Sequence, residues 1–584
     1  MPRLVAALFA VTWMAAAFAA DPPAPVGSRV ADFTLTDAAT GKPWGLADNT
    51  REANATVLLF VGTGCPVNNA YLPKLARWHD TYSKKGVVFV AVNSHAADDA
   101  AAVAKHAKEH AVPFPVLKDA GTKTADRLNV DRIPTAVVLD SGRTVRYAGR
   151  IDDQFTPGVH RDKASTRDMA DALDAVLAKR EVTTPFAAAA GCKLTREGAE
   201  KKAGEPVTYH KHVSRILQAK CQECHREGEA APFQLLTYKQ AKGWAGMIRE
   251  VVADGVMPPW HADAPPGHFA NDRRLTAEQK ATLLAWVDQG CPEGDAKDGP
   301  EPRKFVTGWR LGREPDQVYK MDKAVSVPAQ YAYGLAGMPY QYMTAGEPFA
   351  EDVWVQAAEA RPDYRAAIHH IIVYVLPPGK KLEEVGGDLL SGGMLATYVP
   401  GDQPTVYPPG TARKVAKGSR LLFEVHYTPN GKAGKDQSAV GLIFSKERPT
   451  HEVHGRAILN EKFAIPPGAA NHEVKARYTF DKPVLLTMMS PHMHLRGKAF
   501  RYELVTKDGK RETLLNVPRY DFNWQSAYTP AEPKDIPAGA TVECTAWYDN
   551  SKDNPFNPNP SKKVTWGDQT WEEMMIGFLE YRAK

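Results

Sequence analysis

The sequence predicts a multi-domain chain in which an α/β domain is followed by a small all-α domain and then by two all-β, jelly-roll-like sandwiches. Three observations predict this order. Short apolar runs alternate with helical segments in the first part of the chain. Apolar residues at helical spacing then dominate, and short alternating runs separated by Pro and Gly turns fill the remainder. A length of 584 residues is consistent with about four domains.

Composition limits the class of protein. Apolar residues make up 43% of the chain and charged residues 24%, as in ordinary globular proteins, which excludes a disordered, collagen-like or polytopic membrane chain. The net charge is only +5 and no long block of Lys and Arg occurs, so nucleic acid is not expected as a partner.

Residues 1–20 have the pattern of a cleavable signal peptide. Arg3 precedes an apolar run, and the small residues Ala17 and Ala19 stand before the expected cleavage point. A retained membrane anchor is the alternative. No later apolar stretch is long enough to span a bilayer, so no membrane span is expected after cleavage. The mature protein is therefore expected to be exported to the periplasm or outside the cell, where thiols oxidise.

The first domain is expected over residues 22–182. Runs at 56–61 and 87–92 are apolar and rich in β-branched residues, which is typical of buried parallel strands. The segment between them, 65–85, has helical character, and another strand is expected at 135–139. Strands that alternate with helices predict an α/β sheet.

Cys65 is the candidate reactive residue of this domain. It follows a strand at an expected helix start, where backbone amides lower the pKa of a thiol. With Pro134 before a later strand, residues 22–182 resemble the thioredoxin-like redoxin and peroxiredoxin group, in which a cis-proline faces the cysteine. Asn68 stands where a C-x-x-C motif has its second cysteine, and Thr63 is two residues before Cys65, where peroxidases place Thr three before. Cys65 is therefore either redox active or structural.

Cys192, in a linker expected at 183–205, is a candidate to resolve an oxidised Cys65. Cys291 and Cys544 have no assigned partner.

The second domain, expected over 206–300, carries the strongest local motif. Cys221-Gln-Glu-Cys224-His225 matches the C-x-x-C-H pattern that attaches haem c through two thioethers and an axial imidazole. A zinc site or a disulfide is the alternative. Helical flanks, including a capping box at Thr276-x-x-Gln279, predict a small cytochrome c-like domain. Met257 is the preferred sixth haem ligand, with His261 and His268 as alternatives, whereas Met247 is expected to be a core residue of a helix.

Two sandwiches are expected at 301–448 and 449–584, and their histidines are distinctive. Alternating runs occur at 371–375, 420–427, 440–444, 484–489 and 541–548. His492 and His494 can share one strand face and so chelate one metal. His369 and His370 are neighbours, which normally point to opposite faces, so joint chelation requires a twisted or terminating strand.

The ordered histidine set resembles the copper type II, ascorbate-dependent monooxygenases, the family of peptidylglycine α-hydroxylating monooxygenase and dopamine β-monooxygenase. Four elements carry the resemblance, and they cover 305–584: His369-His370, Glu424-Val-His426-Tyr, His492-Met-His494-Leu-Arg-Gly497 and Glu572-Glu573-Met574-Met575. It implies two copper ions. One is held by His369, His370 and His426 and passes on an electron; the other is held by His492, His494 and Met574 and activates dioxygen.

Several positions depart from the peptide-hydroxylating members of that family. Ser490 replaces an Arg that binds a peptide carboxylate, and Ile576 and Phe578 replace an Asn and a Tyr. The resemblance therefore implies a more apolar substrate than a peptide. Arg496 is expected at the surface, with anion binding as the alternative.

The predicted function is an exported copper-dependent monooxygenase that hydroxylates a C–H bond of a small organic substrate with O2. The catalytic residues would be Met574, His492 and His494, with Cys65 as a further candidate. Electrons would come through the haem c domain, from an electron-donor protein, or from ascorbate. The alternatives are a non-catalytic periplasmic electron-transfer or metal-binding redox protein and a thiol peroxidase with accessory domains.

Overall fold

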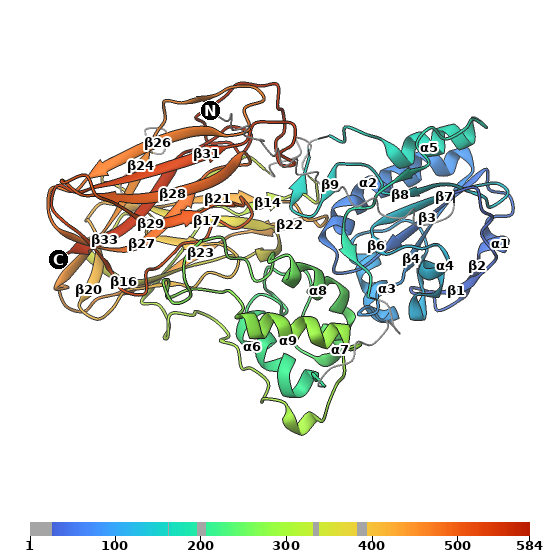
Figure 1. Cartoon of the computed structure of the whole chain (residues 1–584), viewed down its shortest axis with the longest axis horizontal. Helices are drawn as coiled ribbons and strands as arrows, with labels where there is room; N and C mark the ends of the chain where they lie inside the picture. The colour runs from blue at the N-terminus through green and yellow to red at the C-terminus, as the bar shows by residue number, and fades with distance from the viewer. Residues whose placement is uncertain (1–25, 162, 196–205, 331–337, 382–393) are drawn as a thin grey trace, which may run out of the picture.

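A computed structural model describes residues 26–161, 163–195, 206–330, 338–381 and 394–584. The predicted signal peptide lies outside these residues. Figure 1 shows three parts: an α/β domain at one end, β-rich sheets at the other, and a helical domain beside the junction between them.

The α/β domain is built on one eight-stranded sheet with the order β11-β8-β7-β3-β4-β5-β1-β2. The central strand β3 is buried along its whole length, runs parallel to β4 and is antiparallel to β7. The helices and strands of the α/β domain are β1 (Thr34–Asp37), β2 (Pro43–Gly45), α1 (Leu46–Asn49), β3 (Ala55–Val61), α2 (Pro66–Tyr82), β4 (Val87–Asn93), α3 (Ala100–Glu109), β5 (Val116–Lys118), α4 (Lys123–Arg127), β6 (Arg132–Ile133), β7 (Thr135–Asp140), β8 (Val145–Gly149), β9 (Phe155–Thr156), β10 (Val159–His160) and α5 (Asp168–Leu177). The predicted α/β sheet is confirmed.

Part of the predicted linker at 183–205 belongs to this domain. Strand β11 (Phe186–Ala187) pairs with β8, and β12 (Cys192–Lys193) pairs with β6. Strands of two residues leave no periodic pattern in a sequence, which is why this segment was expected to be a linker.

The helical domain contains α6 (Ser214–Lys220), α7 (Tyr238–Gly243), α8 (Ala245–Ala253) and α9 (Ala277–Asp288). The capping box predicted at Thr276 and Gln279 is present at the start of α9. Buried residues of this domain such as Leu217, Ile248 and Trp286 belong to the same hydrophobic cluster as the α/β sheet, so the two domains share a core. Its assignment as a cytochrome c domain stays a prediction.

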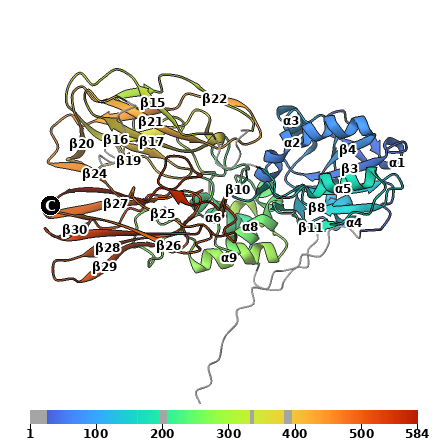
Figure 2. The same ribbon diagram turned by 90° about the horizontal axis from the view of Figure 1, so that it is seen from above.

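The β-rich part differs from the two separate sandwiches that the sequence predicts. One nine-stranded sheet runs through both halves, because β20 (Thr411–Val415) pairs in parallel with β24 (His451–Leu459). Each half of it has a four-stranded partner sheet, β15-β21-β17-β18 or β26-β31-β28-β29 (Figure 2). The other strands are β13 (Gln317–Lys320), β14 (Val325–Val327), β15 (Gln341–Ala345), β16 (Val353–Arg361), β17 (Ile368–Leu376), β18 (Ala396–Tyr398), β19 (Thr405–Val406), β21 (Arg420–Tyr427), β22 (Gly434–Asp436), β23 (Ala439–Phe444), β25 (Ala464–Ile465), β26 (His472–Thr479), β27 (Val484–His492), β28 (Gly497–Val505), β29 (Arg511–Val517), β30 (Lys534–Ile536), β31 (Thr541–Tyr548), β32 (Val564–Thr565) and β33 (Ile576–Ala583).

A third hydrophobic layer lies between the two halves. Ile372 and Tyr374 of β17 and Leu422 of β21 pack there with Ile576 and Phe578 of β33. The alternate residues of these strands fill the two sandwich cores instead. Because residues two apart share a strand face, His370, Glu424 and His426 also point into this layer.

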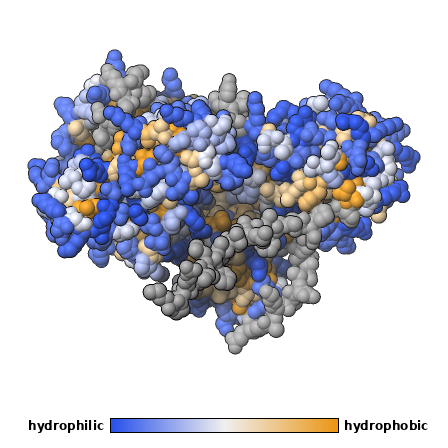
Figure 3. Space-filling view, turned by 45° about the horizontal axis from the view of Figure 1, so that its top comes forward, coloured by the Kyte–Doolittle hydropathy of each residue, from blue (hydrophilic) through white to orange (hydrophobic). Residues whose placement is uncertain are grey.

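Polar side chains dominate the face in Figure 3, with smaller hydrophobic patches among them. Among the described residues, no helix is long and apolar enough to span a membrane.

Candidate functional sites

Cys65 lies where the sequence predicts it, between β3 and α2, at the N-cap of the helix. Its side chain is fully buried, and its Sγ donates to the carbonyl oxygen of Ile133 at 3.3 Å. The peptide bond between Ile133 and Pro134 is cis, and the cysteine contacts the residue that precedes this proline.

The structure brings Cys192 to Cys65. Cys192 pairs with Ile133 across the β12–β6 ladder, and its thiol is hydrogen bonded to the Cys65 side chain. Gly191 permits this approach, because a Cβ there would lie 2.1 Å from the Ile133 carbonyl oxygen. Two thiols that are 127 residues apart, from position 65 to 192, therefore form one buried pair.

The two thiols have opposite pKa shifts. Burial raises the pKa of Cys65, but the hydrogen bonds from the Cys192 thiol and from backbone amides, including those of Asn68 and Val67, outweigh burial and hold the pKa below its ordinary value. The hydrogen bond to Cys65, together with burial, raises the pKa of Cys192 well above its ordinary value. Of the two thiols, Cys65 therefore loses its proton more readily than Cys192.

The helical domain covers Cys65. At the neighbouring Gly64, a Cβ would lie 2.8 Å from Trp244 and 3.1 Å from Phe233. These two rings stack on each other with centroids 3.9 Å apart. An ion pair of 2.7 Å between Arg132 and Glu250 joins the same two domains beside Pro134.

The C-x-x-C-H motif follows α6. The amides of Cys224 and His225 both donate to the carbonyl oxygen of Cys221, so the three side chains lie on one turn of chain. The Nδ1 atom of His225 lies 3.2 Å from the Phe233 carbonyl oxygen, a contact that holds the ring with Nε2 as the remaining ligand atom. Met257 is half buried in the loop after α8. Its role as an axial ligand stays a prediction.

His369, His370 and His426 come together as the sequence predicts. Among the described residues, they form the one group of three or more histidine, cysteine or acidic residues whose candidate ligand atoms lie within 4.8 Å of one another. His370 is directly opposite His426 in the β17–β21 ladder. The register of that ladder shifts between Ile368 and His370, and such a bulge re-aims a side chain, which allows His369 to join its neighbour.

Several buried imidazole nitrogens of the histidine set make no hydrogen bond within the described part of the chain. Among the described residues, the buried Nε2 atoms of His369, His370 and His494 have no hydrogen-bond partner. Burial, together with neighbouring imidazoles, lowers the pKa of His369 and His370 well below the ordinary value. Neutral rings with vacant lone pairs are the state in which imidazole binds a metal.

His492 and His494 are oriented through their Nδ1 atoms. The Nδ1 of His492 donates to Gln525 Oε1 at 2.8 Å, and that of His494 lies 3.3 Å from the Glu572 carbonyl oxygen. Contacts of this kind fix a metal-binding imidazole and leave Nε2 as the ligand atom. The sequence pattern missed Gln525, which lies in a loop and carries no motif.

The two histidine sets are close to each other. The ring of His370 lies 6.2 Å from that of His492, centroid to centroid. Tyr340 lies among both sets, with its ring 4.8 Å from His426 and 6.1 Å from His494. The two histidine sets therefore face the same layer between the sandwiches, and their division into two copper sites stays a prediction.

Met574 and Met575 point to different places. Met574 belongs to the layer between the sandwiches, and Met575 belongs to the core of the second sandwich. This placement agrees with the preference for Met574 as the thioether near His492 and His494, although its coordination stays a prediction.

Arg496 is not the surface residue that the sequence predicts. It is fully buried, its Nε donates to Asn550 and its Nη1 to the Trp571 carbonyl oxygen. The buried carboxylate of Glu573 accepts the backbone amides of His494 at 2.9 Å and Arg496 at 2.6 Å. The contacts of Arg496 and Glu573 thus connect the turn at His492–His494 to the segment that carries Met574.

Comparison with known proteins identifies relatives of the first domain. Residues 26–148 match the model of the AhpC/TSA family. The thiol-disulfide oxidoreductase ResA of Geobacillus kaustophilus is 30% identical over 121 residues, which are 21% of this chain and 67% of the relative. The ResA of Halalkalibacterium halodurans is 24% identical over 131 residues, 22% of this chain and 72% of the relative. The chain thus spans about two thirds of the length of these relatives.

Solved structures match the same part of the chain. A hypothetical protein from Sinorhizobium meliloti is 30% identical with a TM-score of 0.28, covering 30% of this chain and 96% of that one. A secreted disulfide oxidoreductase of Mycobacterium tuberculosis is 26% identical with a TM-score of 0.17, covering 19% of this chain and 79% of that one.

Proposed function

The chain belongs, through its first domain, to the AhpC/TSA family, and from this premise we propose that it is a thiol–disulfide redox protein whose working pair is Cys65 and Cys192. The hydrogen bond between these two buried thiols beside Pro134 carries the proposal. Of the functions predicted from the sequence, this one develops the exported redox-protein alternative, with Cys192 in place of the second cysteine of a C-x-x-C motif.

The proposed reaction is an exchange of two electrons. The Cys65 thiolate attacks a substrate disulfide, which forms a mixed disulfide and releases one substrate thiolate. Cys192 transfers its proton to that leaving thiolate and, as a thiolate, attacks Cys65 Sγ. This step breaks the mixed disulfide, releases the second substrate sulfur as a thiolate, which takes a proton from solvent, and leaves a Cys65–Cys192 disulfide. Because Cys65 is fully buried beneath Phe233 and Trp244, a protein substrate requires displacement of the helical domain.

Oxidation with hydroxyethyl disulfide, followed by alkylation and peptide mapping, tests this pair. We expect a Cys65–Cys192 crosslink in the wild-type protein and in the control Cys544→Ala, which removes a buried thiol of β31. Cys65→Ser should lose all exchange, and Cys192→Ser should accumulate a mixed disulfide on Cys65. A wild-type protein in which Cys65 pairs with another cysteine, or stays reduced, refutes the assignment.

The histidine cluster supports a second candidate function, copper-dependent monooxygenation of a small organic substrate. Its donor set fits copper, since imidazoles suit both oxidation states and the thioether of Met574 favours Cu(I). The facing Nδ1 atoms of His369 and His370, which are 2.9 Å apart, and the buried Nε2 atom of His494, which makes no hydrogen bond among the described residues, are consistent with a metal that is bound there. Copper would supply one-electron transfer and dioxygen chemistry. The protein would hold the imidazoles neutral and oriented, through Gln525 for His492.

Metal analysis tests this candidate. We expect two copper ions per chain after titration and gel filtration. His426→Ala should lose one of them, while the control His454→Ala, a half-exposed histidine of β24, should retain both. Zinc in place of copper, or unchanged stoichiometry in His426→Ala, contradicts the copper assignment. O2 uptake that matches hydroxylated product then separates an oxygenase from a copper carrier.

The C-x-x-C-H motif supports covalent haem in the helical domain. Its two thiols and the Nε2 of His225 fit haem c, which would supply one-electron transfer to the cluster. A haemochrome spectrum that survives denaturation is expected for the wild-type protein and not for Cys221→Ser. If His225→Ala leaves turnover with a cytochrome reductant unchanged, the haem is not the electron donor.

A further inference from the structure

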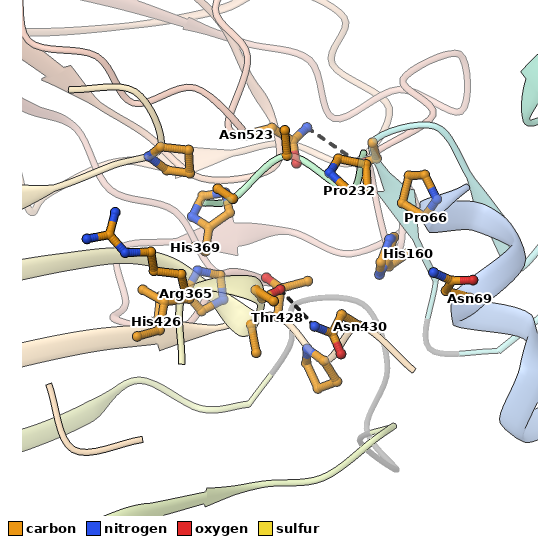
Figure 4. A pocket seen from close by; sticks show the side chains of 18 of the residues that line it. Pro66, Asn69, His160, Pro232, Arg365, His369, His426, Thr428, Asn430 and Asn523 are labelled. Carbon is orange, nitrogen blue, oxygen red and sulfur yellow. Dashed lines mark hydrogen bonds between the residues drawn. The ribbon is translucent and has the colours of Figure 1, made fainter. Parts of the chain in front are cut away.

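A cavity of about 410 Å³ lies where the three parts of the molecule meet. In Figure 4, His369 and His426 lie on one side of it and Pro66, Asn69 and His160 of the α/β domain on the other. The helical domain contributes residues 229–232, and the second sandwich contributes residues of its loops. The cavity has the size of a pocket for a small organic molecule.

Direct contacts between the domains hold the walls together. Gly431 lies so close to α2 that a Cβ there would be 2.2 Å from the Asn69 carbonyl oxygen. The Nδ1 atom of His110 lies 3.2 Å from the Gly431 carbonyl oxygen. At the opposite wall Arg365 pairs with Glu229 at 2.6 Å. The cavity is therefore a built chamber with fixed walls on several sides.

The walls of the chamber are mostly apolar, and the charged side chains in them have partners of opposite charge. Three charged side chains line the chamber. Arg365 is paired with Glu229, and Lys432 lies 3.5 Å from Glu109. Burial lowers the pKa of His160 to about 4, so this ring is neutral near pH 7. The apolar lining includes Pro66, Val159, Pro232, Ile368, Leu495, Phe522 and Phe556.

The inner end of the chamber is aromatic. Phe522 stacks on His369 with centroids 4.7 Å apart and lies 5.8 Å from His426. A flat apolar molecule at this end would contact the same rings that form the histidine cluster. Access to the cluster from this side therefore passes between the α/β and helical domains.

We propose that this three-domain chamber is a binding site for a neutral small molecule with an apolar, flat body, and that the α/β and helical domains select this ligand by forming two of its walls. This assigns the first domain a role in recognition that is separate from its thiol chemistry. The site would exist whether or not copper is bound, because its walls consist of protein side chains alone.

The proposal is tested by calorimetric titration of the full-length protein with 2-naphthol in the presence of EDTA. We expect one saturable site, with an affinity for 2-naphthol at least about tenfold higher than for the anion 2-naphthoate. Ala231→Trp and Thr428→Phe fill the chamber from different domains, and each should weaken binding by about tenfold or more. Val306→Trp, at a residue 61% exposed and away from the chamber, is the control and should bind as the wild type does.

Photo-crosslinking locates the ligand without any substitution. A diazirine derivative of naphthalene should label peptides that contain residues 158–160, 229–232 or 426–432. Absence of saturable binding, equal affinity for the naphthoate anion, or labelling elsewhere overturns the proposal. Because EDTA removes metal ions, the binding measurement does not depend on copper. The copper assignment can therefore fail while the chamber still binds 2-naphthol.

Discussion

The cysteine pair and the histidine cluster are both buried, yet they satisfy their polar atoms in opposite ways. Cys65 is surrounded by internal partners, namely Cys192, the Ile133 carbonyl oxygen and the amides at the start of α2. The histidine cluster leaves buried Nε2 atoms without a hydrogen bond among the described residues. A buried polar atom without a partner costs free energy, so such a set is typical of a site that binds a further group. The first site therefore satisfies its polar atoms internally, whereas the second has donor atoms that fit the proposed metal.

The largest effect is expected from uncovering the cysteine pair. Trp244→Ala removes the ring that lies against Gly64 and should cost about 3–5 kcal/mol in the free energy of unfolding. It should also raise the rate at which iodoacetamide labels Cys65, which is fully buried in the wild type. Mass spectrometry of quenched samples, with denaturation curves, measures both. If the labelling rate does not change, the helical domain is not what shields the thiol.

The next effect concerns the support behind the histidine cluster. Glu573→Ala leaves the amides of His494 and Arg496 without their acceptor and removes a carboxylate next to a buried guanidinium. We expect a loss of about 3 kcal/mol or more, since breaking a buried charged contact leaves the other partner uncompensated. Urea denaturation measures this loss. Glu573→Gln, which keeps an acceptor oxygen, is the control and should lose less.

A smaller effect, on the pKa of Cys65, is expected when the Cys192 thiol is removed. Cys192→Ala removes a hydrogen bond to the Cys65 thiolate, while burial continues to favour the thiol form. The pKa of Cys65 should therefore rise, so that its thiolate appears only at higher pH than in the wild type. Absorbance of the thiolate at about 240 nm against pH, corrected with a Cys65→Ser sample, follows the titration. A titration that moves to lower pH, or not at all, contradicts the proposed hydrogen bond.

The smallest effect is expected at the ion pair that joins the first two domains. Glu250→Gln should cost about 0.2–1 kcal/mol, because Arg132 and Glu250 are each more than a quarter exposed and water screens their attraction. Thermal unfolding in low and high salt measures this difference, which should shrink as salt rises. A cost of several kcal/mol would show that this contact, and not the packing of Trp244, holds the helical domain on Cys65.

The amino-acid sequence is enough to predict the helices and strands that have a clear apolar periodicity or a capping motif. Strand β3, helix α2 after Cys65, the capped helix α9 and the alternating strands of the last part follow from apolar periodicity and capping residues. The convergence of His369 and His370 with His426 was predicted from a resemblance, and the bulge in β17 supplies its geometric reason.

Only the tertiary structure decided which distant residues meet. Cys192 joins Cys65 through a strand of two residues, Arg496 is buried beside Glu573, and the two histidine sets share one layer. The chamber between three domains likewise exists only where their surfaces touch. Local pattern records which face of an element is apolar. The local sequence pattern does not indicate which other helix or strand will cover that face, because this depends on packing between segments that are far apart in the chain.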